Sequence, residues 1–213
     1  MRRVAEFEKV SFEQFCQALV GYEEKYSTAE SETTQDGMTM RYFRRMPMQE
    51  IYDALKLPTR ATSGSAGYDF KAPFDFTLRP GQTIKIPTGV RVRIDDGWWL
   101  GCFPRSGLGF KYRLQLDNTV GVIDRDYYGS GNEGHIFAKI TNDSKNGKNL
   151  SVKAGDAFVQ GVFIPYGITY SDDVQAVRDG GMGSTDHMNK AHTPRDCRAA
   201  RKRLVSLPAS YFF

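Results

Sequence analysis

A run of acidic and aromatic residues follows a short β-type stretch in the middle of the chain. Val120–Ile123 has the apolar, β-branched character of a strand, and residues 124–129 then read DRDYYG. Aspartates disfavour strands and bulky rings need cover, so one interpretation is a polar hairpin turn. The other is a site in which the carboxylate of Asp124 orients a water molecule and accepts its proton, as general bases do. Arg125 and Asp126 are interpreted as a solvated pair.

A second stretch has the residue types that bind anionic oxygen. Residues 104–109 read PRSGLG, in which proline ends the preceding strand and the glycines allow a tight turn of the backbone. Successive N–H groups could then form a nest for phosphate, and Arg105 adds a planar fork of donors. A plain turn is the alternative. A positioned water and a set of phosphate donors are the main requirements of phosphoryl hydrolysis.

Two further stretches could complete such a site. Gln160 lies inside an apolar stretch, where a neutral amide is unusual and either pairs with backbone or binds a ligand. Residues 178–185 read RDGGMGST, and their glycines would let Arg178, Ser184 and Thr185 close on phosphates. Taken alone, such a glycine-rich stretch is more typical of a disordered segment.

Five stretches, in this order, resemble the five motifs of the trimeric dUTPase family, the deoxyuridine triphosphate nucleotidohydrolases. They are residues 66–69 (AGYD), 104–109, 116–129 (LDNTVGVIDRDYYG), 155–160 (GDAFVQ) and 178–185, and the resemblance covers roughly residues 52 to 186. It implies a jelly-roll-like β-barrel, a homotrimer, and three shared active sites that each draw motifs from more than one subunit. The implied reaction is hydrolysis of dUTP to dUMP and pyrophosphate by attack of water on the α-phosphorus.

The resemblance also assigns roles to individual residues. Asp124 is the implied general base, and Gln160 lies against the α-phosphate and the attacking water. Tyr127 lies under the deoxyribose, where a flat ring against C2′ leaves no room for a ribose hydroxyl. The carboxylate of Asp69 holds waters of a Mg²⁺ ion that is bound mostly by the triphosphate, because magnesium keeps several waters. The other implied substrate-binding residues are Arg105, Ser106 and Gly107 at the phosphates, Asn118, Gly121, Val122 and Ile123 at the uracil motif, and Arg178, Met182, Gly183 and Ser184 in a closing arm.

The chain departs from the family pattern in two places. Met182 stands where the family has an aromatic residue over the uracil, and the arm from Arg178 to that position is one residue shorter. Methionine can pack on a base through its thioether but gives no ring stacking. The loop Ser130–Gly134 is longer than usual, and the sequence assigns it no role.

The elements that must position these residues are short and β-rich. Runs separated by Gly, Pro, Asp and Asn have the spacing of an all-β barrel or sandwich, and no long helix intervenes to build βαβ units. The expected strands are Tyr68–Lys71, Phe74–Leu78, Gln82–Val92, Trp98–Phe103, Val120–Ile123, His135–Asn142, Leu150–Val152 and Ala157–Tyr166.

The two ends of the chain look different from this β-domain. Ser11-Phe12-Glu13-Gln14 resembles a capping box that opens a helix over about 11–26, with an apolar stripe that needs either the main domain or a neighbouring subunit as partner. We expect an N-terminal extension (1–45), a β-domain (46–176), an arm (177–186) and a basic tail (187–213). The tail is expected to be disordered, with docking of its last aromatics or contact with nucleic acid as the alternative.

Composition narrows the class of protein. The 213 residues carry a net charge of +4, but residues 190–213 hold six basic side chains and one acidic one, so the rest of the chain is at −1 and lacks the signature of a nucleic-acid binder. We expect no membrane segment, since no apolar run approaches about 18 residues, and no signal peptide, since no apolar stretch follows Arg2 and Arg3. Three scattered cysteines favour a reducing compartment, the cytoplasm, over a disulfide framework.

Two rival functions stay open at this point. The dCTP deaminase family shares the fold but places a glutamate in the strand after the aspartate turn, where this chain has Lys139. Alternatively, the β-domain is a non-catalytic, nucleotide-gated scaffold whose extensions bind a protein or nucleic acid. Met182 is the feature that keeps this second rival open.

Overall fold

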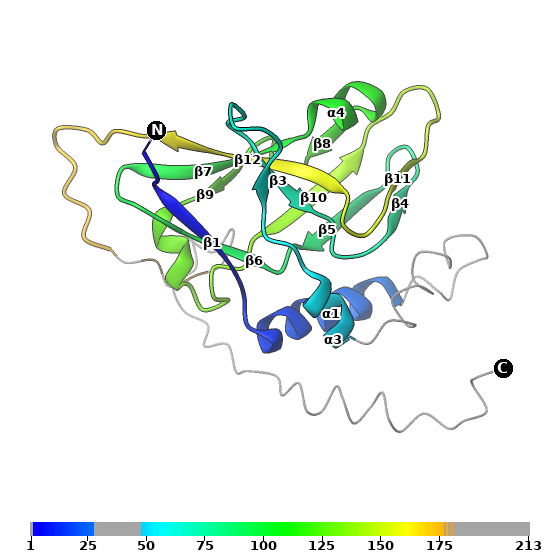
Figure 1. Cartoon of the computed structure of the whole chain (residues 1–213), viewed down its shortest axis with the longest axis horizontal. Coiled ribbons are helices and arrows are strands. Elements are labelled where there is room, and N and C mark those ends of the chain that lie inside the picture. The colour runs from blue at the N-terminus through cyan, green and yellow to red at the C-terminus, as the bar shows by residue number, and fades with distance from the viewer. Residues whose placement is uncertain (1, 28–47, 177, 179, 181–213) are drawn as a thin grey trace.

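The computed structural model describes residues 2–27, 48–176, 178 and 180, and its strands form a β-structure beside two short N-terminal helices (Figure 1). The helices before the β-domain are α1 (Phe12–Ser27) and α3 (Met48–Ala54), and α4 (Ser106–Tyr112) lies within it. The strands are β1 (Ala5–Lys9), β2 (Thr59–Arg60), β3 (Tyr68–Lys71), β4 (Phe76–Leu78), β5 (Thr83–Pro87), β6 (Val90–Ile94), β7 (Trp98–Pro104), β8 (Leu114–Leu116), β9 (Gly121–Ile123), β10 (Phe137–Asn142), β11 (Leu150–Val152) and β12 (Ala157–Pro165).

The strands pair in four antiparallel sheets around one core. The largest has the order β2-β3-β12-β7-β9, a second has the order β5-β10-β8, and the pairs β1-β6 and β11-β4 complete the set. Burial alternates along the strands, as in β5, where Ile84 and Ile86 are buried and Lys85 between them is exposed. The expected all-β fold is confirmed.

The N-terminal helix packs on the β-domain of its own chain. Ser11 caps it, because its Oγ accepts a hydrogen bond from the N–H of Gln14 at 3.1 Å. Phe15, Cys16 and Leu19 of the predicted apolar stripe are buried, and Phe15 and Leu19 belong to the same core cluster as the strands. The main domain is therefore the partner of this part of the stripe.

Several elements differ from the sequence-based expectation. The prediction of a single strand over 82–92 was wrong. The chain turns at Gly89, where φ is +72°, and forms two strands, β5 and β6. The two halves then pair with different partners, β10 and β1. Strands β1 and β8 were not predicted, because such short segments acquire strand structure only through pairing with their neighbours.

No helix in the described part of the chain is both long and apolar enough to cross a membrane. The expected boundary between extension and β-domain falls among residues 28–47, and most of the arm and all of the tail lie beyond residue 180. These three boundaries lie outside the described residues and stay predictions.

Candidate active site

Three of the predicted phosphate-side residues meet on the largest sheet. The register of β3, β12 and β7 places Asp69 opposite Gln160, and Gln160 opposite Phe103, two residues before Arg105. Arg105 Nε lies 3.0 Å from Asp69 Oδ1, and the Gln160 amide donates to the carbonyl of Pro104 at 3.3 Å. A cation, a carboxylate and an amide from three distant motifs are thereby brought together.

Gly67 leaves space for the Gln160 amide in this cluster. A Cβ added there would lie 2.8 Å from Oε1 of Gln160, closer than real side chains approach. The small residue in the first motif therefore makes room for the amide of the fourth motif. This explains why the sequence Ala66-Gly67 precedes Asp69.

The expected nest after Pro104 is a short helix instead. Arg105 is extended (φ −68°, ψ 137°) and precedes α4, which ends at Arg113 with φ +50°. The prediction of a tight turn was wrong, because the two glycines of this stretch are held in helical conformation by the surrounding fold. The N–H groups at the start of a helix have no intrahelical acceptor, so Ser106 and Gly107, which are exposed, still offer donors to an anion.

The acidic turn follows β9 as a 3-10 helix over Arg125–Gly129. Asp124 is its extended N-terminal residue and is partly exposed. Arg178, from the last described part of the chain, returns to this turn: its Nη2 lies 2.5 Å from Asp124 Oδ2 and its Nε 2.9 Å from Asp126 Oδ1. The interpretation of Arg125 and Asp126 as a pair was wrong, since Arg125 pairs with Asp96 at 2.8 Å.

Tyr127 is fixed at the base of the turn. Its side chain is 2% exposed, and its hydroxyl donates to the carbonyl of His135 at 2.7 Å and accepts from the amide of Asn132 at 2.8 Å. Ser130 Oγ donates to the carbonyl of Tyr127 at 2.7 Å. The longer loop Ser130–Gly134, which had no role assigned from sequence, therefore holds Tyr127. Its length was the one signal by which these residues could have been found.

A cavity of about 290 Å³ is lined in part by β9, the strand before the turn, although neither Asp124 nor Tyr127 lines it. Asn118, Gly121 and Ile123 of the predicted uracil motif line it, together with Cys102 and Lys139. Val122 does not line it and is 55% exposed, because side chains alternate along β9. The volume is at the lower end of the range for small-ligand pockets, about 300–1,000 Å³.

The predicted site residues form two groups that are apart in one chain. Ile123, which precedes Asp124, pairs with Leu100 in β7, whereas Arg105 follows the opposite end of that strand. Five residues of extended chain separate Leu100 from Arg105, which is about 17 Å. Asp124 and Tyr127 therefore do not lie with Arg105, Gln160 and Asp69 in a single chain. Met182, Gly183 and Ser184 lie outside the described residues.

Comparison with known proteins identifies the family. The family model described as dUTPase matches residues 53–186. The deoxyuridine 5′-triphosphate nucleotidohydrolase of Lactococcus lactis subsp. lactis (strain IL1403) is 39% identical over 134 residues, which cover 62% of this chain and 88% of that protein. The chain belongs to the dUTPase family.

Solved dUTPase structures are also similar to this dUTPase. The crystal structure from Streptococcus mutans is 41% identical, with a TM-score of 0.49, and the match covers 55% of this chain and 90% of that one. The dUTPase from phage phi11 of S. aureus, whose D95N mutant structure is described as showing coordination of a structural Mg(II) ion, is 23% identical with a TM-score of 0.47, over 58% of this chain and 92% of that one.

Lys139 distinguishes this dUTPase from the dCTP deaminase family. Its ammonium lies 2.7 Å from Asp117 Oδ2 at the edge of the cavity. The position where the deaminase family has a glutamate is therefore a cation in an ion pair, which cannot accept a proton from a substrate.

Proposed function

We propose that this dUTPase hydrolyses dUTP to dUMP and pyrophosphate by attack of a water molecule held by Asp124 on the α-phosphorus. The observation that carries the assignment is the position of Asp124, directly after a strand that lines the cavity and next to the anchored Tyr127. The water gives its proton to the carboxylate while its oxygen bonds to the α-phosphorus. The bond from that phosphorus to the α,β-bridging oxygen breaks, and pyrophosphate leaves.

The nucleoside fits the cavity by its chemistry. The amide of Asn118 has both donors and an acceptor, as the edge of a pyrimidine requires. Gly121 lets β9 lie close to β7 beside this amide, since a Cβ there would lie 3.0 Å from Cys102 Cβ. Tyr127, locked by two hydrogen bonds on its hydroxyl, is the proposed platform for the deoxyribose.

The triphosphate binds at the second group of residues. Arg105 offers its guanidinium, the start of α4 offers N–H groups, and Gln160 offers an amide. Since these lie about 17 Å from Asp124 along one chain, a complete site must combine residues of different copies. This supports a homotrimer with shared active sites, in which Arg178, Met182, Gly183 and Ser184 belong to the closing arm.

Asp69 is the residue that we propose to contact the waters of a bound Mg²⁺ ion. No group of three or more His, Cys, Asp or Glu suited to a metal occurs among the described residues, so the protein supplies no cage there. Asp69 Oδ1 faces Arg105, which leaves Oδ2 to accept hydrogen bonds from the waters of a triphosphate-bound ion. One carboxylate is enough for such outer-sphere contact, so the residues fit Mg²⁺. The ion, when bound, neutralises charge on the phosphates.

The direct test is Asp124→Asn. This change keeps the size of the side chain but removes its basicity, so we expect pyrophosphate release to fall by at least about 10²-fold. Binding of a non-hydrolysable dUTP analogue and the oligomeric state should be unchanged. Pyrophosphate release by this variant at the wild-type rate would refute the assignment of the base.

The buried cysteines bear on the compartment in which the enzyme works. Cys16 and Cys102 are buried and free, and burial raises the pKa of the Cys102 thiol to about 12, so that it stays protonated and unreactive. Such thiols agree with a reducing compartment, and we place the enzyme in the cytoplasm. We propose dUTP as its ligand, and no described feature of the β-domain favours binding of nucleic acid.

A further inference from the structure

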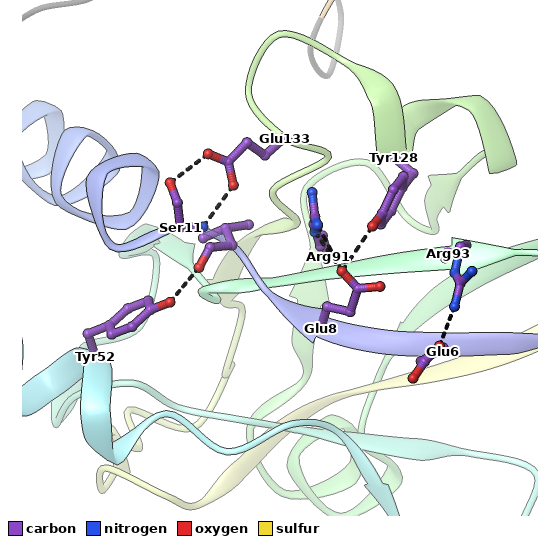
Figure 2. Close-up of polar contacts among 9 residues, drawn as sticks. Glu6, Glu8, Ser11, Tyr52, Arg91, Arg93, Tyr128 and Glu133 are labelled. Carbon is purple, nitrogen blue, oxygen red and sulfur yellow. Dashed lines mark hydrogen bonds and ion pairs between the residues drawn. The ribbon is translucent and has the colours of Figure 1, made fainter.

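The catalytic turn is tied to the N-terminal segment through Glu8 of β1. One oxygen of Glu8, Oε2, accepts hydrogen bonds from Tyr128 Oη at 2.9 Å and from Arg91 at 3.1 Å (Nε) and 2.8 Å (Nη2), as Figure 2 shows. The guanidinium of Arg91 also lies over the Tyr128 ring, 4.3 Å from its centre. Tyr128 lies inside the 3-10 turn, next to Tyr127 and four residues after Asp124.

The charges at this contact strengthen the hydrogen bonds that Glu8 accepts. Burial alone would raise the pKa of the Glu8 carboxyl, but hydrogen bonds from Tyr128 and Arg91 outweigh it and lower the pKa. The carboxylate is therefore ionised at neutral pH, and its hydrogen bonds have the added strength of a charged acceptor. The hydrogen bond to Glu8 correspondingly raises the pKa of Tyr128, which keeps the donating proton on the phenol.

A second contact ties the same segment to the end of the loop. Glu133 accepts from the N–H of Ser11 at 2.7 Å and from its hydroxyl at 2.5 Å, so that a residue 122 positions away completes the cap of α1 (Figure 2). Glu133 has a φ of +58°, a conformation that side chains rarely adopt. The fold therefore holds Glu133 in an unfavourable backbone conformation where it meets Ser11.

A third contact links α1 to Tyr127 through His135. The ring of Phe15 in α1 packs on the ring of His135, with centres 6.3 Å apart, and the carbonyl of His135 accepts the hydrogen bond of Tyr127. Gly134 allows the loop to approach the turn, because a Cβ there would lie 2.7 Å from the Cα of Tyr128. The N-terminal segment thus contacts the turn directly through Glu8, and indirectly through Glu133 and His135, which follow the turn in the chain.

We propose that Glu8 and Tyr128 are positioning residues for dUTP hydrolysis, and that β1 and the start of α1 form a brace that fixes the catalytic turn. The inference rests on the proposed roles of Asp124 and Tyr127. Glu8 touches no substrate. It sets the orientation of the turn through Tyr128, so that its loss changes both turnover at Asp124 and discrimination of the sugar at Tyr127.

The chain offers a matched control on the same strand pair. Glu6 pairs with Arg93 in β6 just as Glu8 pairs with Arg91, and the register places the two pairs side by side. Glu6 is exposed and its carboxylate bonds to Arg93 rather than to the turn, so Glu6→Gln weakens the attachment of β1 without releasing Tyr128. A purely structural role for β1 predicts the same behaviour for both variants.

The test compares Glu8→Gln, Tyr128→Phe, their double variant and Glu6→Gln in the full-length enzyme. Glu8→Gln and Tyr128→Phe should each lower kcat about tenfold with a smaller change in KM, and should lower the preference for dUTP over UTP. The double variant should resemble either single one, because both remove the same charge-assisted hydrogen bond: Gln offers only a neutral acceptor, and Phe has no hydroxyl. Amide hydrogen exchange over 124–134 should rise in these three variants and not in Glu6→Gln.

The outcomes separate this inference from the assignment of the base. If Asp124→Asn is inactive while Glu8→Gln matches Glu6→Gln in kcat, sugar preference and exchange, the brace is wrong and the assignment stands. If Asp124→Asn is fully active, the assignment fails, and the inference fails with it, even where exchange over 124–134 rises. Effects of Glu8→Gln and Tyr128→Phe that multiply in the double variant would also overturn the inference.

Discussion

The guanidinium of Arg178 bridges Asp124 and Asp126, at 2.5 Å from Oδ2 of the first and 2.9 Å from Oδ1 of the second. Its side chain is 18% exposed, and its central carbon lies 5.8 Å from the centre of the Tyr127 ring. The planar fork therefore fixes the direction of the proposed base and leaves Oδ1 of Asp124 for water. A single ammonium group cannot span both carboxylates in this way.

Arg178→Lys should consequently impair the enzyme while keeping its charge. Loss of one charge-assisted hydrogen bond is expected to lower kcat/KM for dUTP by about tenfold, with little change in thermal unfolding. The matched control is Arg125→Lys, because Arg125 lies in the same turn but pairs with the exposed Asp96. Steady-state pyrophosphate release from the two variants decides the point; equal activities would contradict the proposed bridge.

Gly67→Ala should affect activity more than stability. The new methyl group would meet Oε1 of Gln160 at 2.8 Å, and that amide is the end of a flexible side chain, which can move away. We expect kcat to fall about tenfold through loss of the amide from the phosphates, with a stability change of less than about 1 kcal/mol. Gly64→Ala is the control, since nothing lies within 4 Å of a Cβ there. A normal kcat for Gly67→Ala would argue against a role for Gln160.

Mixed subunits should recover activity from two inactive variants. Asp124→Asn removes the proposed base, and Arg105→Ala removes a phosphate ligand about 17 Å away along the same chain. If each site combines residues of different subunits, random mixing of the two variants should restore about a quarter of wild-type activity. The measurement is pyrophosphate release after co-refolding of equal amounts. No recovery in mixtures that are shown to contain both subunits would contradict shared sites.

His135 should make the folded state sensitive to mild acid. Burial, aided by the charge of Lys85, lowers its pKa to about 3, and its Nε2 accepts a hydrogen bond from the N–H of Gly89 at 2.9 Å. Below the unfolded value of about 6.5 only the unfolded chain takes up this proton, so stability falls by up to about 1.4 kcal/mol per pH unit as pH drops. Above that value the group contributes no pH dependence.

Urea unfolding between pH 7.5 and 5 measures this effect. The free energy of unfolding should decline below pH 6.5 in the wild type and stay flatter in His135→Gln. The carboxyls whose pKa is lowered by their partners, Glu8, Asp75 and Asp117, act in the same direction but only near their ordinary pKa of about 4 and below. Parallel slopes for the two proteins would exclude His135 as the source.

The sequence by itself determined the family, the all-β class and the identity of the chemical groups. Motif residues such as Asp124 and Arg105 are recognisable because chemistry restricts which residue types can act and at which spacing they occur. The capping role of Ser11 was also predictable, because its hydrogen bond with the N–H of Gln14 joins residues three positions apart.

Only the tertiary structure decided which of these groups meet. Strand register placed Gln160 beside Asp69 and set Asp124 at the far end of β7, and such pairings depend on contacts between residues far apart in the chain. For the same reason, the sequence did not predict the hydrogen bond from Tyr128 to Glu8 or the hydrogen bond from Ser11 to Glu133. Local sequence carries no record of a partner 120 residues away, so these contacts appear only when the sheets have formed.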